Sequence, residues 1–302
     1  MKHVLTSKEL VWTNAQSPTG DELAELIRNT DLDPVDAEFI TQSHNRPEIT
    51  LRPAYILMLI HIPVFDRKLR VTRSAGLYFI IKNNHLFSLH YDPIVTLDAI
   101  RQGFESSEEK KEEYFGEDAL SLCLYIITLL YDGAFHKLER LGKHIDISED
   151  AVFQGNERKM VEEISILTRD VMDFRKIVRP QKSLFAVVPQ HEFINGDTAS
   201  KWRRVRGQLL KMWDLLESMV ESVRELSNTN FTLLQHKENE ILRLLTIYSI
   251  VVIPMLILVD PYFAPGAIDA DIKDKIAFWI VLGVLVTTLA IIMAKLKRKR
   301  YR

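Results

Sequence analysis

One stretch of the sequence sets polar and aliphatic side chains at intervals of three to four residues. An amide opens the series, two hydroxyls and four aliphatic side chains follow, and a carboxylate ends it: Asn239, Leu242, Leu245, Thr246, Ser249, Ile253, Leu256 and Asp260. This spacing keeps all eight on one side of a helix. Amide, hydroxyl and carboxylate oxygens are the groups that contact hard cations.

The sequence contains no pattern typical of an enzyme. It has no glycine-rich phosphate loop, no paired-cysteine zinc site and no His-Glu-x-x-His run. The single cysteine, Cys123, lies in an apolar run and is predicted to be an inert buried thiol. His136, Glu139 and His144 could bind a metal, but the surface of a helix explains their spacing more simply. We predict no enzymatic activity and no covalently bound cofactor.

Charge and termini restrict the class of protein further. The formal net charge of −2 lacks the basic excess of nucleic-acid-binding proteins, so no nucleic-acid partner is expected. A lone cysteine cannot form an internal disulfide bond, which favours a reducing compartment. The first residues lack the apolar core of a signal peptide. The long N-terminal part is therefore expected to stay in the cytoplasm.

Two uncharged apolar segments lie near the C-terminus, at 244–259 and 276–294. About 20 apolar residues in a helix cross a bilayer core, so both are predicted to be membrane helices, the first extended to 242–263. A buried helical hairpin in a soluble core is the alternative. The tail after the second segment is strongly basic, whereas the loop between the segments has four acids and two lysines. Positive residues stay inside, which predicts cytoplasmic N- and C-termini in the inner membrane.

The part before these segments reads as a mixed α+β domain. Thr19 and Glu22 form a capping-box pattern that predicts a helix over 22–29. The apolar run 54–64 predicts a buried strand, and alternation on both sides of Asn83-Asn84 predicts a hairpin over 75–82 and 85–91. Apolar periodicity predicts helices over 120–144 and 157–179, with Pro180 and Pro189 bracketing a connection.

One long helix is expected from Ser200 to about Val259, because the stretch has no proline before Pro254 and keeps a near-heptad apolar rhythm. A lone helix of this length has too little neighbouring protein to bury its apolar face. Self-association is the natural solution.

These features resemble the CorA-type magnesium transporters. The run 239–247 looks like the pore entry of that family, Ile253-Pro254-Met255 looks like its mid-membrane proline, and 54–91 is similar to its central strands. The basic tail looks like the ring of cations beside the pore, and its residues are Lys295, Lys297, Arg298, Lys299 and Arg300. The resemblance covers the order of elements along the whole chain and is sharpest from Trp213 onward.

The resemblance implies a homopentamer in the lipid bilayer and a division of the chain into six parts. These are a cytoplasmic α/β funnel domain with a helical extension (1–198), a stalk helix (199–241), a first membrane helix (242–263), an outer loop (264–275), a second membrane helix (276–294) and a basic cytoplasmic tail (295–302). The first membrane helix would line a central pore and the second would face lipid. Mg²⁺ or another divalent cation would be the substrate or a regulator.

Each residue of the pore-lining face keeps two interpretations. Asn239 could hold a hydrated ion at the inner mouth or set the register of the helical bundle. The aliphatic residues could form constrictions that gate by dewetting, or could pack and face lipid. Thr246 and Ser249 could offer hydroxyls to the pore or to their own helix. Asp260 could form a ring of carboxylates that attracts cations, or could be an incidental acid before Pro261.

The sequence departs from the family at its hallmark motif, which in the family is linked to the selection of hydrated magnesium. The family ends its first membrane helix with Gly-Met-Asn, usually just after a tyrosine. Here Tyr262 takes the place of that tyrosine, and Phe263-Ala264-Pro265 stand where the motif should be. A channel or transporter for Mg²⁺, and possibly Zn²⁺, Co²⁺ or Ni²⁺, with altered selectivity is the first expectation. The alternative is a non-conducting membrane scaffold or regulatory protein that keeps the architecture.

Overall fold

The computed structural model describes residues 2–7, 9–41, 46–66, 71–107, 111, 115, 118–190, 194–263, 279, 280, 283, 286 and 287. Side chains are described for all of these except Val251 and 254–263. The chain forms two compact units, Met1–Asn230 and Phe231–Arg302. The first unit holds a mixed sheet with helices on both faces.

The sheet has six strands in the order β1-β2-β6-β5-β4-β3. Their bounds are β1 Lys2–Ser7, β2 Leu10–Gln16, β3 Glu48–Leu51, β4 Ile56–Asp66, β5 Val71–Lys82 and β6 His85–His90. β2 and β6 run parallel, and the other neighbours are antiparallel. The N-terminal pair β1 and β2 had no counterpart among the strands expected from the sequence.

The predicted hairpin and buried strand are confirmed. β5 and β6 pair directly across Asn83-Asn84, from Lys82 opposite His85 to Leu77 opposite His90. Asn83 takes a left-handed backbone with φ of 50°, which asparagine tolerates better than most residues in a tight turn. β4 runs two residues past the predicted end of the 54–64 strand, and its residues 56–60 are fully buried.

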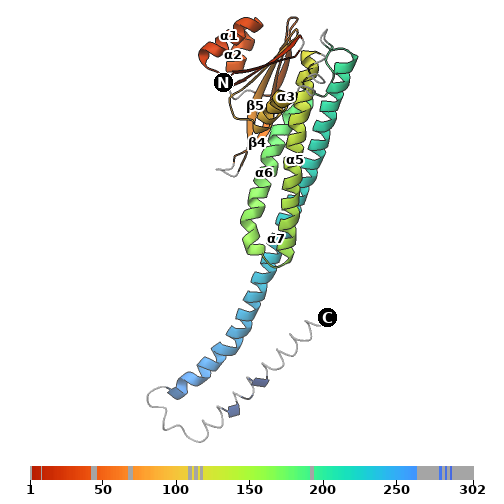
Figure 1. Cartoon of the computed structure of the whole chain (residues 1–302). Coiled ribbons are helices and arrows are strands. Elements are labelled where there is room, and N and C mark those ends of the chain that lie inside the picture. Colours follow the sequence, from red (N-terminus) through yellow and green to blue (C-terminus); the bar gives the residue numbers. More distant parts are fainter. Residues whose placement is uncertain are drawn as a thin grey trace. The chain divides into compact units, whose positions relative to one another are not determined.

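Helices cover both faces of the sheet (Figure 1). α1 (Gly20–Thr30) and α2 (Pro34–Thr41) pack on one face around Leu26, Ile40 and Tyr78. The predicted capping box is present, because Thr19 and Glu22 each bond to the other's backbone. α3 (Val95–Ser106) and α5 (Ala119–Phe153) lie on the other face, where Phe104 meets Trp12 edge to face. The first unit is therefore a three-layer α/β domain.

α5 and α6 (Glu157–Leu184) form a long antiparallel hairpin that also contacts the sheet. Among the described residues α5 is the one helix long and apolar enough to cross a membrane, but 67% of its apolar window is buried inside the protein. It is therefore a core helix of this domain. Cys123 is fully buried on it, and burial raises the pKa of its thiol, as expected for an inert cysteine.

The predicted break at Pro180 is wrong, because α6 continues through it to Leu184. Proline removes one backbone donor from a helix. The next residue, Gln181, is 1% exposed and bonds to β4 and α5, so tertiary contacts keep this turn helical. The connection to the last helix begins only after Leu184.

α7 runs from Gly196 to Phe263, which confirms the long helix expected from the sequence. Its apolar face up to Asn230 is buried within the first unit, through Trp202, Leu209, Met212 and Leu216 among others. The expectation that this face must be buried by self-association is therefore wrong for 196–230. Neighbouring helices of the same chain cover it.

Candidate functional site

The first part of α7 is held against α6 by charged and aromatic side chains. The ring of Trp213 lies 4.2 Å from Lys182 Nζ and 5.4 Å from the guanidinium carbon of Arg175. Arg175 also donates two hydrogen bonds to the Glu217 carboxylate, at 2.7 and 3.3 Å. Arg175 and Lys182 lie seven residues apart on α6, and Trp213 and Glu217 lie four apart on α7, so each pair shares a helix face. We call these four residues the α6–α7 clamp.

The α6–α7 clamp was not predicted from the sequence. Gln208 adds a contact to α5, because its amide nitrogen donates to the Asp132 carboxylate at 2.6 Å. Together these contacts fix the rotation of α7 about its own axis within the first unit. The side of α7 that faces α5 and α6 is therefore set by named pairs rather than by apolar burial alone.

Beyond Arg243 α7 is apolar on all sides. Between Arg243 and Asp260 the sequence has no charged residue, and the backbone is helical throughout. Leu242 and Leu244 lie about 200° apart around the helix, and their exposed fractions are 58% and 68%. A helix that is apolar all round is stable only when other apolar material covers it. Lipid, another part of the chain or further copies of it must therefore cover this segment.

The structure places six of the eight predicted pore-lining side chains on one face of this segment. Asn239, Leu242, Leu245, Thr246, Ser249 and Ile253 all lie on α7, and none is buried within the chain. Leu256 and Asp260 belong to the same helical backbone, but their side chains lie outside the described residues.

The two hydroxyls on this face donate to their own helix. Thr246 Oγ1 bonds to the Leu242 carbonyl at 2.8 Å, and Ser249 Oγ bonds to the Leu245 carbonyl at 2.9 Å. Such bonds use the hydroxyl hydrogen and leave oxygen lone pairs as acceptors. Both hydroxyl oxygens therefore remain able to contact a cation, while neither can donate a further hydrogen bond.

The remaining predicted site residues fall at or beyond the described end of α7. Phe263 is the last residue of α7, and Ala264 and Pro265 lie outside the described residues. The same is true of the basic tail Lys295, Lys297, Arg298, Lys299 and Arg300. Of the predicted second membrane helix, Trp279, Ile280, Gly283, Val286 and Thr287 are described, and all five are helical.

The histidines of α5 behave as surface residues. His136 Nδ1 lies 3.2 Å from the Glu139 carboxylate, and the His136 side chain is 77% exposed. Within the described part of the chain, no group of three or more His, Cys, Asp or Glu side chains is arranged to hold a metal ion. A metal site built on His136, Glu139 and His144 therefore has no support.

Comparison with known proteins decides the family. A sequence model described as "CorA-like Mg2+ transporter protein" matches residues 7–298, almost the whole chain. The chain belongs to this family of transporters.

Individual relatives of this CorA-like protein support the same family assignment. It is 23% identical over 278 residues to a cobalt/magnesium transport protein CorA of Thermotoga maritima, covering 89% of this chain and 76% of that protein. It is 20% identical over 276 residues to a putative metal ion transporter, YfjQ, of Bacillus subtilis, covering 91% and 84%. The complete structure of the CorA magnesium transporter from Methanocaldococcus jannaschii superimposes with a TM-score of 0.78 at 19% identity, covering 97% of this chain and 92% of that chain. The structural likeness shows a shared fold.

Proposed function

We propose that this CorA-like protein is a homopentameric channel or transporter for divalent cations in the cytoplasmic membrane. Both termini would lie in the cytoplasm, and the α7 face from Asn239 to Asp260 would line the path. The observation that carries the proposal is the continuity of α7. The helix packs within a folded domain up to Asn230 and, past Arg243, continues as an uncharged segment that the described part of the chain leaves mostly uncovered.

Five copies of one helix face around an axis would place apolar and polar rings in alternation along the path. Leu242, Leu245 and Ile253 would form narrow apolar rings, which control conduction by excluding water. Thr246 and Ser249 would add rings of acceptor oxygens, since their hydrogens are used within the helix. The Asp260 carboxylates would concentrate cations at the outer mouth.

The selectivity is proposed to differ from that of family members with the Gly-Met-Asn motif. The sequence has Phe263-Ala264-Pro265 at that position, which lacks the asparagine amide. The Thermotoga maritima relative is named for cobalt and magnesium, and that name makes Mg²⁺ and Co²⁺ the first substrates to test, followed by Ni²⁺ and Zn²⁺.

Ion flux into liposomes tests the proposal with a matched pair of variants. Purified full-length protein should admit at least one of Mg²⁺, Co²⁺, Ni²⁺ and Zn²⁺ down an inward gradient. Leu242→Asn should raise the flux severalfold, because a polar ring cannot exclude water. Leu244→Asn makes the same change on the opposite side of α7 and should leave the flux near that of the unmodified protein.

Two results would contradict the proposal. One is the absence of any cation movement by both the unmodified protein and Leu242→Asn while native mass spectrometry shows an intact pentamer. That result would favour the non-conducting scaffold, which the missing motif and the apolar face also motivate. The other is equal flux increases in Leu242→Asn and Leu244→Asn, which would place the path elsewhere.

A further inference from the structure

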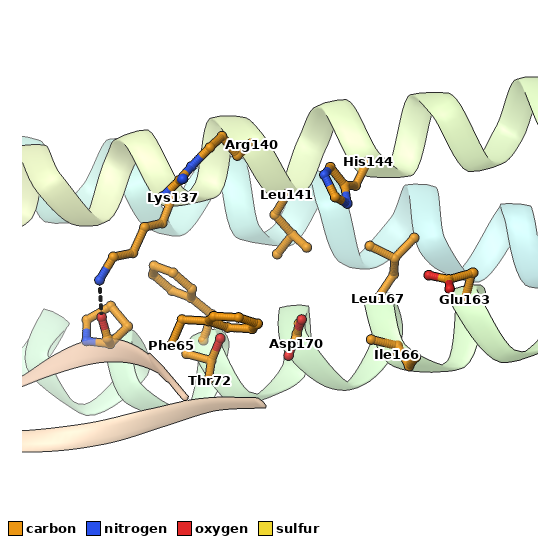
Figure 2. Close-up of a pocket in the computed structure, with 12 residues that line it drawn as sticks. Phe65, Thr72, Lys137, Arg140, Leu141, His144, Glu163, Ile166, Leu167 and Asp170 are labelled. Carbon is orange, nitrogen blue, oxygen red and sulfur yellow. Dashed lines mark hydrogen bonds between the residues drawn. The ribbon is translucent and has the colours of Figure 1, made fainter. Parts of the chain in front are cut away.

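A cavity of about 280 Å³ lies within the first unit, away from the pore-lining face. It opens between the end of the β4–β5 hairpin and the groove formed by α5 and α6 (Figure 2). Its size is near the lower end of the range for small-molecule sites in proteins, roughly 300 Å³ and above. Neither the family assignment nor the proposed pore gives this cavity a role.

The cavity has an apolar interior. Leu141 of α5 and Leu167 of α6 project toward each other across it (Figure 2), and Phe174 of α6 also lines it. Leu167 and Phe174 are 5% and 2% exposed, so they are fixed by the core. An occupant must therefore present apolar groups at the middle of the cavity.

The two walls carry opposite charge. Lys137 and Arg140 come from α5, whereas Glu163 and Asp170 come from α6 (Figure 2). Lys137 is held in place because its Nζ donates to the Pro63 carbonyl at 2.8 Å, and an ammonium group has two further hydrogens to donate. Burial and the neighbouring Arg140 lower the pKa of Lys137, because both disfavour its positive charge, and a carboxylate placed between the two cations would offset this cost.

The charged groups are also separated along the helices. Glu163 and Asp170 lie seven residues apart on α6, which corresponds to about 10 Å at 1.5 Å per residue. Antiparallel pairing of α5 and α6 puts Lys137 and Arg140 near the Asp170 end, while His144 lies near Glu163 (Figure 2). Extended peptide advances about 3.3 Å per residue, so two or three residues span this length.

We propose that this cavity binds a short zwitterionic peptide with apolar side chains, with its carboxylate at Lys137 and Arg140 and its ammonium group at Glu163. Asp170 lies at the same end as Lys137 and Arg140 and offsets one of these two cations, which leaves one positive charge at that end and the negative charge of Glu163 at the other. A zwitterion meets both charges, whereas a ligand with a single charge would meet only one. A metal ion does not suit the lining, because the described residues form no metal-binding cluster.

The affinity of such a ligand can be bounded. Leucyl-leucine has about 17 non-hydrogen atoms, and about 0.3 kcal/mol per atom corresponds to a Kd on the order of 0.1–1 mM. Isothermal titration of the full-length protein in detergent should show this binding. The same titration into empty micelles corrects for partition of the peptide.

Capped peptides separate the contributions of the two charges. N-acetyl-leucyl-leucine lacks the ammonium group, and leucyl-leucine amide lacks the carboxylate, while both keep the apolar side chains. Each should bind at least about tenfold more weakly than leucyl-leucine, since hydrogen bonds to charged groups contribute about 1.5–3 kcal/mol. Equal binding of all three peptides would overturn the proposal, as would the absence of binding by leucyl-leucine.

Two matched pairs of variants locate the binding. Arg140→Gln should abolish the preference for the free carboxylate over the amide, whereas Lys143→Gln, an exposed residue outside the lining on the same helix, should keep it. Glu163→Gln should abolish the preference for the free ammonium over the acetylated form, and the neighbouring exposed Glu162→Gln should keep it. Equal losses within either pair would place the peptide elsewhere. Unchanged thermal unfolding of each variant confirms that the fold is intact.

Discussion

The side-chain amide of Gln181 pairs with both backbone groups of His61. Its Nε2 donates to the His61 carbonyl at 2.8 Å, and its Oε1 accepts from the His61 N–H at 3.3 Å. β3 pairs with β4 only from Ile56 to Leu59, so at His61 this edge of β4 has no neighbouring strand. The amide of Gln181 therefore takes the place of a strand and ties α6 to the sheet. Two residues further along β4, Lys137 Nζ likewise donates a hydrogen bond to the Pro63 carbonyl.

Replacing Gln181 by leucine should destabilise the first unit by about 3 kcal/mol. The substitution removes both bonds to His61 and the acceptor for the Tyr131 hydroxyl at 2.9 Å, and each lost partner of a buried polar group costs about 1–3 kcal/mol. Hydrogen exchange at the amides of Ile60, His61 and Ile62 should accelerate, and the unfolding temperature should fall by several degrees.

Gln102→Leu, at an exposed position of α3, is the matched control and should change stability by less than about 0.5 kcal/mol. If Gln181→Leu exchanged its β4 amides no faster than Gln102→Leu, the tie between α6 and the sheet would not contribute to stability.

Local signals in the sequence predicted the elements that depend on local chemistry. The capping box of Thr19 and Glu22, the turn at Asn83-Asn84 and the long helix α7 need only neighbouring residues to be recognised. The predicted break at Pro180 was wrong because Gln181 bonds to His61, which lies 120 positions away in the sequence. β1 and β2 were not predicted because their place in the sheet depends on the pairing of β2 with β6, in which Val11 lies opposite His85, 74 residues later in the chain.

The candidate site likewise has local features that the sequence predicts and tertiary features that it does not. Helical spacing alone put Asn239 and Ile253 on one face of α7, because that relationship is local. The α6–α7 clamp and the cavity between Lys137 and Asp170 join helices whose pairing is tertiary, and a periodic pattern in one helix does not reveal the register of another. The buried face of 196–230 was assigned to other copies of the chain for the same reason.

Arg175 and Glu217 should show a measurable coupling energy across the α6–α7 clamp. Their side chains are 33% and 41% exposed, so the expected coupling is about 1 kcal/mol, at the upper end for ion pairs near the surface. A double-mutant cycle with Arg175→Met and Glu217→Gln on unfolding free energy measures it. The coupling should shrink in 1 M salt, where the screening length is about 3 Å.

The pair Arg224 and Glu221 is the control for this cycle. Both side chains are more than 60% exposed and lie on the same helix, and their coupling should be smaller. A coupling for Arg175 and Glu217 no larger than that of the control pair would mean that Trp213 and apolar packing alone hold α6 against α7.

His90 should make the first unit less stable in mild acid. Its side chain is fully buried, and burial lowers its pKa below the usual 6.5, although the Asp92 carbonyl at 2.7 Å and the charges of Asp98 and Asp92 oppose this shift. Below pH 6.5 the unfolded chain binds a proton that the folded chain does not, so stability falls with decreasing pH until the folded pKa is passed.

The measurement is unfolding free energy between pH 8 and pH 5 for the full-length protein and for His90→Asn. His90 contributes at most about 1.4 kcal/mol per pH unit, and the variant should lose this part of the slope. His85, whose pKa burial and Lys2 also lower, should leave a residual slope in both proteins. Parallel curves for the two proteins would show that His90 titrates alike in the folded and unfolded states.

Tyr55 and Arg52 should protect the first unit against acid through Asp36. Desolvation of this buried carboxylate raises its pKa, but the hydrogen bonds from Arg52 at 2.9 Å and from the Tyr55 hydroxyl at 2.6 Å outweigh it, so the pKa of Asp36 is lowered overall. A depressed carboxylate pKa gives stability that is present above the unfolded value of 3.8 and is lost as the pH falls through the folded value.

Tyr55→Phe removes one bond to Asp36 and the acceptor for the Asp33 N–H, and should cost about 2 kcal/mol at pH 7. With less stabilisation of the carboxylate, acid unfolding of the variant should begin at higher pH than in the unmodified protein. Tryptophan fluorescence followed from pH 7 to pH 2 measures both midpoints, and coincident midpoints would show that the Tyr55 hydroxyl does not hold the Asp36 charge.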